Sequence, residues 1–145
     1  FTDQPADANW PTTMALLADA VYLVGAADHA TAVYELLRPY AHRFVAIGQC
    51  ADWYGSVARC LGELTATCGD YDEAVRYFEM GVEADETRGA TRMVVRGMWG
   101  LAETLLRRNG PGDVEHAEAL IADALPTAER LGLVVLARRL AALGK

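Results

Sequence analysis

Three segments of the chain repeat one pattern: an apolar helical stretch, a short turn, and a second helical stretch with an alanine near its start. The matching alanines are Ala32, Ala74 and Ala117, which lie 42 and 43 residues apart (74 − 32 and 117 − 74). A large apolar residue follows each alanine four positions later, namely Leu36, Phe78 and Ile121. One helical hairpin cannot bury its apolar face alone, whereas stacked hairpins share a continuous core. The repeat therefore predicts an all-α fold, an α-solenoid of about three helical hairpins.

Local signals place the helix ends. Gly69 is suited to the end of one helix, and Asp70 with Glu73 forms a capping box at the start of the next. Pro39 ends a helix because proline lacks the N–H that the helix needs. We expect helices near residues 11–24, 28–38, 54–68, 71–84, 89–108, 113–130 and 133–143. Residues 40–53 form the longest irregular stretch, and the apolar run at 44–47 is too short to predict a strand.

These elements indicate one helical-repeat domain over residues 1–145, with repeats near 11–39, 54–85 and 89–130. The final helix at 133–143 presents leucines on one face and is expected to cap the stack. A chain of 145 residues can bury a core without disulfide or metal support. It begins with Phe1 rather than methionine, so we expect a fragment of a larger protein.

The charge balance argues against a nucleic-acid partner. The formal net charge is −7, the isoelectric point is about 4.9, and the thirteen basic residues are scattered. Proteins that bind nucleic acid directly usually display a basic patch that pairs with phosphates. No apolar stretch approaches the roughly 20 residues of a membrane span, and the polar start of the chain shows no secretory leader. We therefore expect a cytoplasmic protein without membrane contact.

Metal and cofactor chemistry find no support in the sequence. The cysteines Cys50, Cys60 and Cys68 are odd in number and contain no CxxC pair, which argues against a zinc site. Reduced thiols in the core of a cytosolic protein are the expected alternative. The three histidines, His29, His42 and His116, have no metal-ligand spacing, and no set of catalytic groups converges. We expect no enzyme activity, no cofactor and no metal.

A binding groove is predicted from the first helix of each hairpin, which lines the inner surface in repeats of this kind. Its candidate residues are Ser56, Arg59, Glu63, Arg96, Trp99 and Glu103. Their spacing of three and four residues puts each set on one helical face. Guanidinium groups beside an indole suit an acidic or C-terminal carboxylate partner. Two alternatives stay open: Arg59–Glu63 is an ordinary i,i+4 pair, and Trp99 belongs to the core. Trp53 and Tyr54 form a second candidate lip.

The repeat resembles the tetratricopeptide repeat. Gly62, Ala74 and Phe78 match its small and aromatic positions, and Tyr71 after Gly-Asp is also typical. The period of 42 to 43 residues exceeds the usual length of about 34. Longer repeats of this sort are similar to the sensor regions of maltose-regulator-like ATPases.

A more specific likeness covers nearly the whole chain. The segments YELLRPYA at 34–41, GDYDEA at 69–74 and AERLGL at 128–133 are similar to the C-terminal region of actinobacterial regulators. Those proteins join a signal-transduction ATPase to helical repeats, and often to a LuxR-type DNA-binding domain, a SARP-type domain or a nucleotide cyclase. No GxxxxGK[ST] phosphate loop occurs here, so the ATPase itself is absent.

The resemblance implies a non-catalytic module that binds a protein segment, a peptide or a small effector and reports it to neighbouring ATPase and output domains. The alternative is a structural role. In that case the repeat packs against its own ATPase, or against a second copy in a homodimer.

Overall fold

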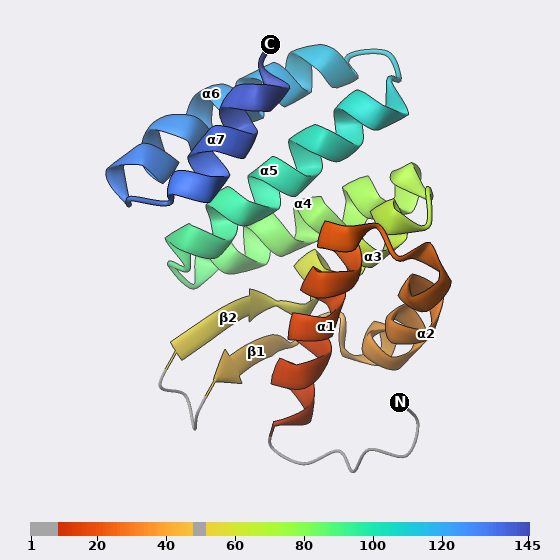
Figure 1. Ribbon diagram of the computed structural model, residues 1–145. Helices are drawn as coiled ribbons and strands as arrows, with labels where there is room; N and C mark the ends of the chain where they lie inside the picture. Colours follow the sequence, from red (N-terminus) through yellow and green to blue (C-terminus); the bar gives the residue numbers. More distant parts are fainter. Residues whose placement is uncertain (1–8, 48–51) are drawn as a thin grey trace.

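The computed structural model describes residues 9–47 and 52–145 (Figure 1). Within those residues the chain is mostly helical. The α-helices are α1 Trp10–Val24, α2 Ala27–Leu37, α3 Val57–Thr67, α4 Tyr71–Thr87, α5 Thr91–Arg108, α6 Asp113–Arg130 and α7 Val134–Leu143. A 3-10 turn, η1, covers Arg38–Tyr40, and two short strands, β1 Phe44–Ile47 and β2 Asp52–Ser56, precede α3.

The seven expected helices are all present, with ends that differ by a few residues from the expected ones. The Asp70 side chain accepts a hydrogen bond from the Glu73 N–H and so caps α4, as the capping box predicts. Helix α2 ends at Leu37, and the chain then tightens into the 3-10 turn that contains Pro39. Local sequence signals therefore suffice to place the helices along this chain.

The predominance of helix agrees with the predicted all-α class, but the two strands contradict the expectation that the run at 44–47 is too short to form one. Strand β1 pairs antiparallel with β2, and Phe44 lies opposite Ser56. Because β2 occupies residues up to Ser56, the helix expected from residue 54 begins only at Val57. Val45 is fully buried in the same apolar cluster as Val57. The apolar run at 44–47 forms a strand because β2 pairs with it. A local sequence pattern does not predict such a pairing partner.

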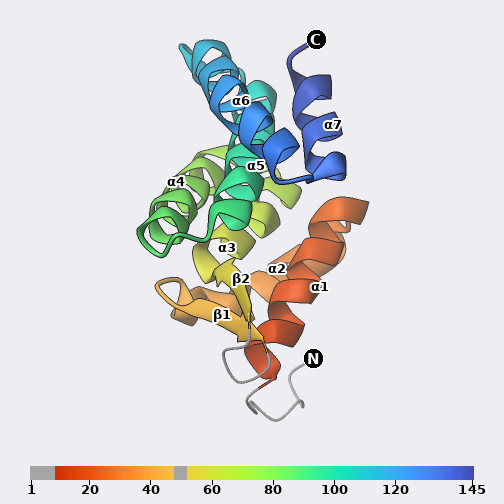
Figure 2. The same ribbon diagram turned by 90° about the vertical axis from the view of Figure 1, so that its left-hand side faces the viewer.

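Consecutive helices pack against one another from α3 to α6, and α7 closes over α5 and α6 (Figure 1). Helices α1 and α2 pack on α3 (Figure 2). The ring of Phe78 on α4 lies where α3 and α5 approach, and glycines make room for it. A Cβ atom at Gly100 would lie 2.6 Å from the ring, and one at Gly62 would lie 2.9 Å from it. These small residues let three helices meet around one aromatic side chain.

The alignment of the first hairpin is wrong by one residue. Ala74 and Ala117 are fully buried, as expected, but Ala32 is exposed. Helix α2 instead buries Val33 and Leu37, which keep the same four-residue spacing. Ala30 is buried on the same helix, and α2 packs on α3 although β1 and β2 separate the two helices in the sequence.

The second hairpin offers a direct test of the repeat. Ala74→Leu is expected to lower the free energy of unfolding by about 1–3 kcal/mol, because the added atoms enter a fully packed contact. Ala119 on α6 is exposed, so Ala119→Leu is expected to change the free energy of unfolding by less than about 0.5 kcal/mol. Urea unfolding measures both. Equal effects would show that position 74 is not a close helix contact.

The cysteines divide by position in the fold. Cys60 is buried in the core as expected, whereas Cys68 is exposed at the end of α3. Cys68 faces solvent because it follows the last helical turn, which corrects the expectation of a core thiol there. Cys50 lies outside the described residues. None of the helices that the structure describes has the length and apolar character to cross a membrane.

Candidate functional site

Four charged side chains from three helices meet inside the molecule, and we call them the ionic cluster: Asp19, Arg59, Glu63 and Arg96. Nη1 of Arg59 donates to Oδ1 of Asp19 at 3.0 Å and to Oε1 of Glu63 at 2.7 Å. Nε of Arg96 donates to the same Glu63 oxygen at 3.1 Å, and its Nη2 lies 3.0 Å from Asp19 Oδ1. The side chains of Arg59 and Glu63 are each 1% exposed. The cluster therefore joins α1, α3 and α5 from within.

This position corrects the predicted groove. Ser56, Arg59 and Glu63 are buried, because α1 and other helices cover the face of α3 that was expected to stay open. Ser56 caps α3 by accepting from the Arg59 N–H, and its hydroxyl donates to Asp85 at 3.1 Å. Arg59 and Glu63 do form the i,i+4 pair that was the open alternative, but in the interior rather than on the surface. These three residues stabilise the fold.

Asp19 is the one member of the cluster that was not predicted as a site residue. It is the only charged residue in α1, a helix that is otherwise apolar or uncharged, and it is 6% exposed. A single acid on such a helix needs a partner when buried. A single acidic residue in an otherwise uncharged helix could have indicated a buried ion pair, but it does not identify Arg59 as the partner.

The predicted lip of Trp53 and Tyr54 is divided between two sides of β2. Tyr54 turns inward, where its hydroxyl donates to Asp19 and its ring lies 5.6 Å from the Arg59 guanidinium. Trp53 is 46% exposed, and its ring packs edge-on against Phe44. Neighbouring residues of a strand point to opposite faces, so the two side chains do not form one lip.

Burial sets the protonation of the ionic cluster. It raises the pKa of Glu63 to about 7, although Arg59 and Arg96 act against the shift. Burial also opposes ionisation of Asp19, but the same two guanidinium groups outweigh it and lower the pKa of that carboxyl. Among the described residues Oε2 of Glu63 has no hydrogen-bond partner, so it can carry a proton. The cluster thus holds Asp19 ionised and Glu63 ready to titrate near neutral pH.

Stability is therefore expected to fall as the pH rises from about 5 to 8. The folded-state pKa of Glu63, about 7, lies above the ordinary 4.5, so the folded state binds this proton more tightly than the unfolded state. The resulting stabilisation is full below the ordinary pKa and is lost as the pH rises through 7. Asp19, with its lowered pKa, titrates at more acidic pH. Glu63→Gln, which cannot titrate, should reduce this decrease in the free energy of unfolding. Denaturant unfolding at several pH values measures it. An unchanged slope would contradict the assignment.

A metal ion does not fit beside the cluster. Asp19, Cys60 and Glu63 offer ligand atoms that lie within 4.8 Å of one another. However, the Arg59 guanidinium donates to both carboxylates, and its Nη2 lies 3.5 Å from the Cys60 sulfur. Burial raises the pKa of the Cys60 thiol to about 12, whereas a metal requires the thiolate. The positively charged Arg59 guanidinium therefore already pairs with the carboxylates that a metal ion would need.

An open cleft of about 600 Å³ lies between the end of α1, helix α5 and helix α7, and we call it the α1–α7 cleft. Figure 2 shows the end of α1 facing α7 with α5 beside them. The side chains that line it include Tyr22, Val24, Trp99, Glu103, Arg107 and Arg139. It is larger than three other hollows between described residues, whose volumes are about 370, 290 and 250 Å³.

The polar groups of this cleft are partly paired. Glu103 accepts from Arg107 at 3.0 Å and from the Tyr22 hydroxyl. Burial raises the pKa of Tyr22 far above its usual range, and the Glu103 carboxylate adds to the shift. The Arg139 guanidinium lies 4.8 Å from the centre of the Trp99 ring. Trp99 is only 5% exposed, so it belongs to the core and also forms the floor of the cleft.

Two of the six predicted groove residues, Trp99 and Glu103, line the α1–α7 cleft. Arg96 joins the ionic cluster and lines a separate hollow of about 250 Å³. Arg107 and Arg139 also line the cleft but were not predicted as site residues. Arg107 could have been found from its position four residues after Glu103. No local sequence pattern predicts that Arg139 lines the cleft, because its position depends on how α7 packs against α5.

No family model, curated protein or solved structure matches the chain. What the α1–α7 cleft can bind therefore has to be argued from its own side chains.

Proposed function

We propose that the chain is a non-catalytic binding module that receives a protein segment, a peptide or a small effector in the α1–α7 cleft. One observation carries the proposal. Trp99 and Glu103 from α5 meet Tyr22 from α1 and Arg139 from α7 in a space open to solvent. Side chains brought together from distant parts of the chain, with apolar and charged groups mixed, are typical of binding pockets.

A tetratricopeptide-like solenoid is the architecture that we propose for this module. It is supported by the hairpins α3–α4 and α5–α6, whose matched residues Ala74 and Ala117 are both fully buried. Consecutive packing from α3 to α6 agrees with a stack, and α7 covers its last hairpin. The first hairpin fits the repeat less closely, because its buried positions are shifted by one residue.

The wider role is proposed from the resemblance to actinobacterial regulators. In that role the chain is the sensor part of a cytoplasmic signal-transduction regulator and acts on neighbouring ATPase and output domains. A non-catalytic role is supported by the ionic cluster, whose charged groups are occupied with one another. A net charge of −7 favours partners other than nucleic acid.

Ligand mapping by NMR tests the binding proposal. The probes are a library of small fragments and a library of short peptides, each added to the isotope-labelled chain. We expect shifted amide signals to gather at residues 22–25, 99–107 and 139–143, which border the α1–α7 cleft. Shifts that gather elsewhere, or no response to either library, would overturn the proposal.

Self-association is a second candidate, favoured by an apolar patch around the turn between α6 and α7. Leu131, Val134 and Val135 are 42%, 57% and 65% exposed. Light scattering over a wide concentration range distinguishes the candidates. A constant monomer mass supports the binding module. A dimer that Val135→Glu dissociates would favour the scaffold.

A further inference from the structure

The size of the α1–α7 cleft indicates the size of its ligand. Its volume of about 600 Å³ lies within the range of roughly 300–1,000 Å³ that is typical of small-molecule sites. The walls are not uniform: Leu23, Val24 and Leu143 provide apolar surface, while Arg107 and Arg139 provide charge. A ligand that contacts both the apolar and the charged parts of the walls must itself be amphipathic.

The charge of the cleft indicates the sign of the ligand. Its lining holds two guanidinium groups, Arg107 and Arg139, and one carboxylate, Glu103, so its net charge is +1. That carboxylate is already held by Arg107 and Tyr22. Arg139 forms no ion pair with any residue that the structure describes. In a chain of net charge −7, this local excess of positive charge favours a singly charged anion.

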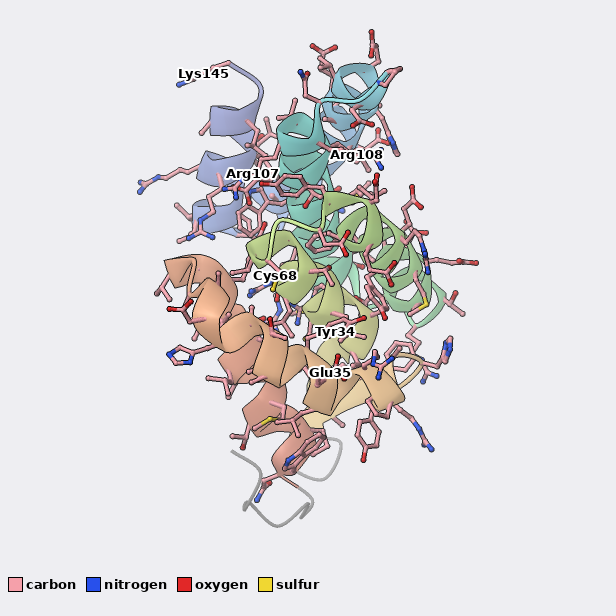
Figure 3. The ribbon with its side chains drawn as sticks, turned by 90° about the vertical axis from the view of Figure 1, so that its right-hand side faces the viewer. Tyr34, Glu35, Cys68, Arg107, Arg108 and Lys145 are labelled. Carbon is pink, nitrogen blue, oxygen red and sulfur yellow. The ribbon has the colours of Figure 1, made fainter. Side chains whose placement is uncertain are left out.

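The geometry around Arg139 favours a carboxylate. Its guanidinium lies over the Trp99 ring, an arrangement that leaves the N–H groups at its edge free to donate. Arg107 comes from α5, and Figure 3 shows it beside the space between α5 and α7. Arg107 is 54% exposed while it holds Glu103, so part of its guanidinium remains accessible. A carboxylate can accept two hydrogen bonds from such donors.

The apolar wall indicates the remainder of the ligand. Leu23 is 50% exposed and Val24 is 76% exposed at the end of α1. Both line the cleft, together with the partly buried Leu143 of α7. A hydrocarbon body placed there would cover these side chains while its charged end reached the arginines.

Resting on the proposed function, we propose that the α1–α7 cleft binds a small amphipathic monocarboxylic acid. The carboxylate pairs with Arg139 and Arg107, and the apolar body lies against Leu23, Val24 and Leu143. A single carboxylate neutralises the net charge of the cleft, whereas a phosphate monoester would bring an excess of negative charge.

Calorimetric titration of the whole chain with four probes of equal chain length tests this ligand class: octanoate, octanol, octylammonium and octyl phosphate. We expect saturable binding of octanoate, at least about tenfold tighter than binding of the other three. Arg139→Gln should weaken octanoate binding about tenfold and leave octanol binding unchanged. Arg138→Gln is the matched control, because Arg138 is exposed and does not line the cleft. Thermal unfolding checks that both variants are folded.

The remaining outcomes overturn the inference. Equal affinity for octanol would show that burial of the hydrocarbon alone determines binding, and tighter binding of octylammonium would reverse the sign of the ligand. Tighter binding of octyl phosphate would replace the carboxylate by a phosphate monoester. Failure of all four probes, with fragments or peptides still mapping to the cleft, would overturn the ligand class and leave the proposed function standing. Failure of the mapping as well would overturn both.

Discussion

Arg59→Met is expected to lower the free energy of unfolding by about 3–5 kcal/mol, the usual cost of breaking a buried ion pair by removing one partner. Arg59 is 1% exposed and donates to both Asp19 and Glu63. Methionine fills much of the same volume but leaves these carboxylates with Arg96 as their remaining cation in the cluster. The loss should therefore exceed what the change in packing alone would produce.

Arg76→Met is the matched control. Arg76 pairs with Glu73 at 3.0 Å on the same helix, but its side chain is 75% exposed. Exposed pairs contribute little, so the expected change is below about 1 kcal/mol. Urea unfolding measures both variants. In an Arg59→Met chain that also carries Asp19→Asn and Glu63→Gln, part of the lost stability should return, because no unpaired carboxylate remains in the cluster. Equal losses for Arg59→Met and Arg76→Met would contradict the buried cluster.

Phe78→Ala is expected to cost about 3–5 kcal/mol of unfolding free energy, because it leaves a cavity where three helices meet. Phe78 is fully buried, and its ring lies against Gly62 of α3 and Gly100 of α5. Helices of a closely packed core cannot collapse freely into such a space. Chemical denaturation gives the size of the loss.

A double-mutant cycle with Gly100→Ala identifies the cause of that loss. Gly100→Ala alone should destabilise by about 1–3 kcal/mol, since its Cβ would lie 2.6 Å from the Phe78 ring. In the Phe78→Ala chain the obstruction is absent. There the same change should be neutral or stabilising by up to about 1 kcal/mol, because alanine favours the helix more than glycine does. Additive effects would show that ring and glycine do not interact.

The ionic cluster and the α1–α7 cleft are connected through α1. Asp19 anchors α1 to Arg59 and Arg96, and Tyr22 on the next turn donates to Glu103 in the cleft. A change that releases Asp19 would therefore shift one wall of the cleft. Arg59 and Glu63, which were predicted as groove residues, therefore help to position that wall from inside the core.

Local signals in the sequence were enough to predict the helices, their approximate ends and part of the central contact, namely Phe78 and Gly62 but not Gly100. Helical spacing of three and four residues, the capping box at Asp70 and the small residues around Phe78 are local signals, each readable within one or two turns. They placed the seven helices correctly and identified Ala74 as a buried position. They also identified Trp99 and Glu103, two of the residues that line the cleft.

Which helical faces are covered depends on contacts between segments that are distant in the sequence. Arg59 is buried because Asp19, 40 residues away in the sequence, comes to lie against it. The run at 44–47 is a strand because residues 52–56 return beside it. The cleft exists because α7 brings Arg139 over Trp99. Helix formation depends on neighbours three and four positions away, whereas burial, strand pairing and cleft formation depend on contacts between distant segments, which local spacing does not encode.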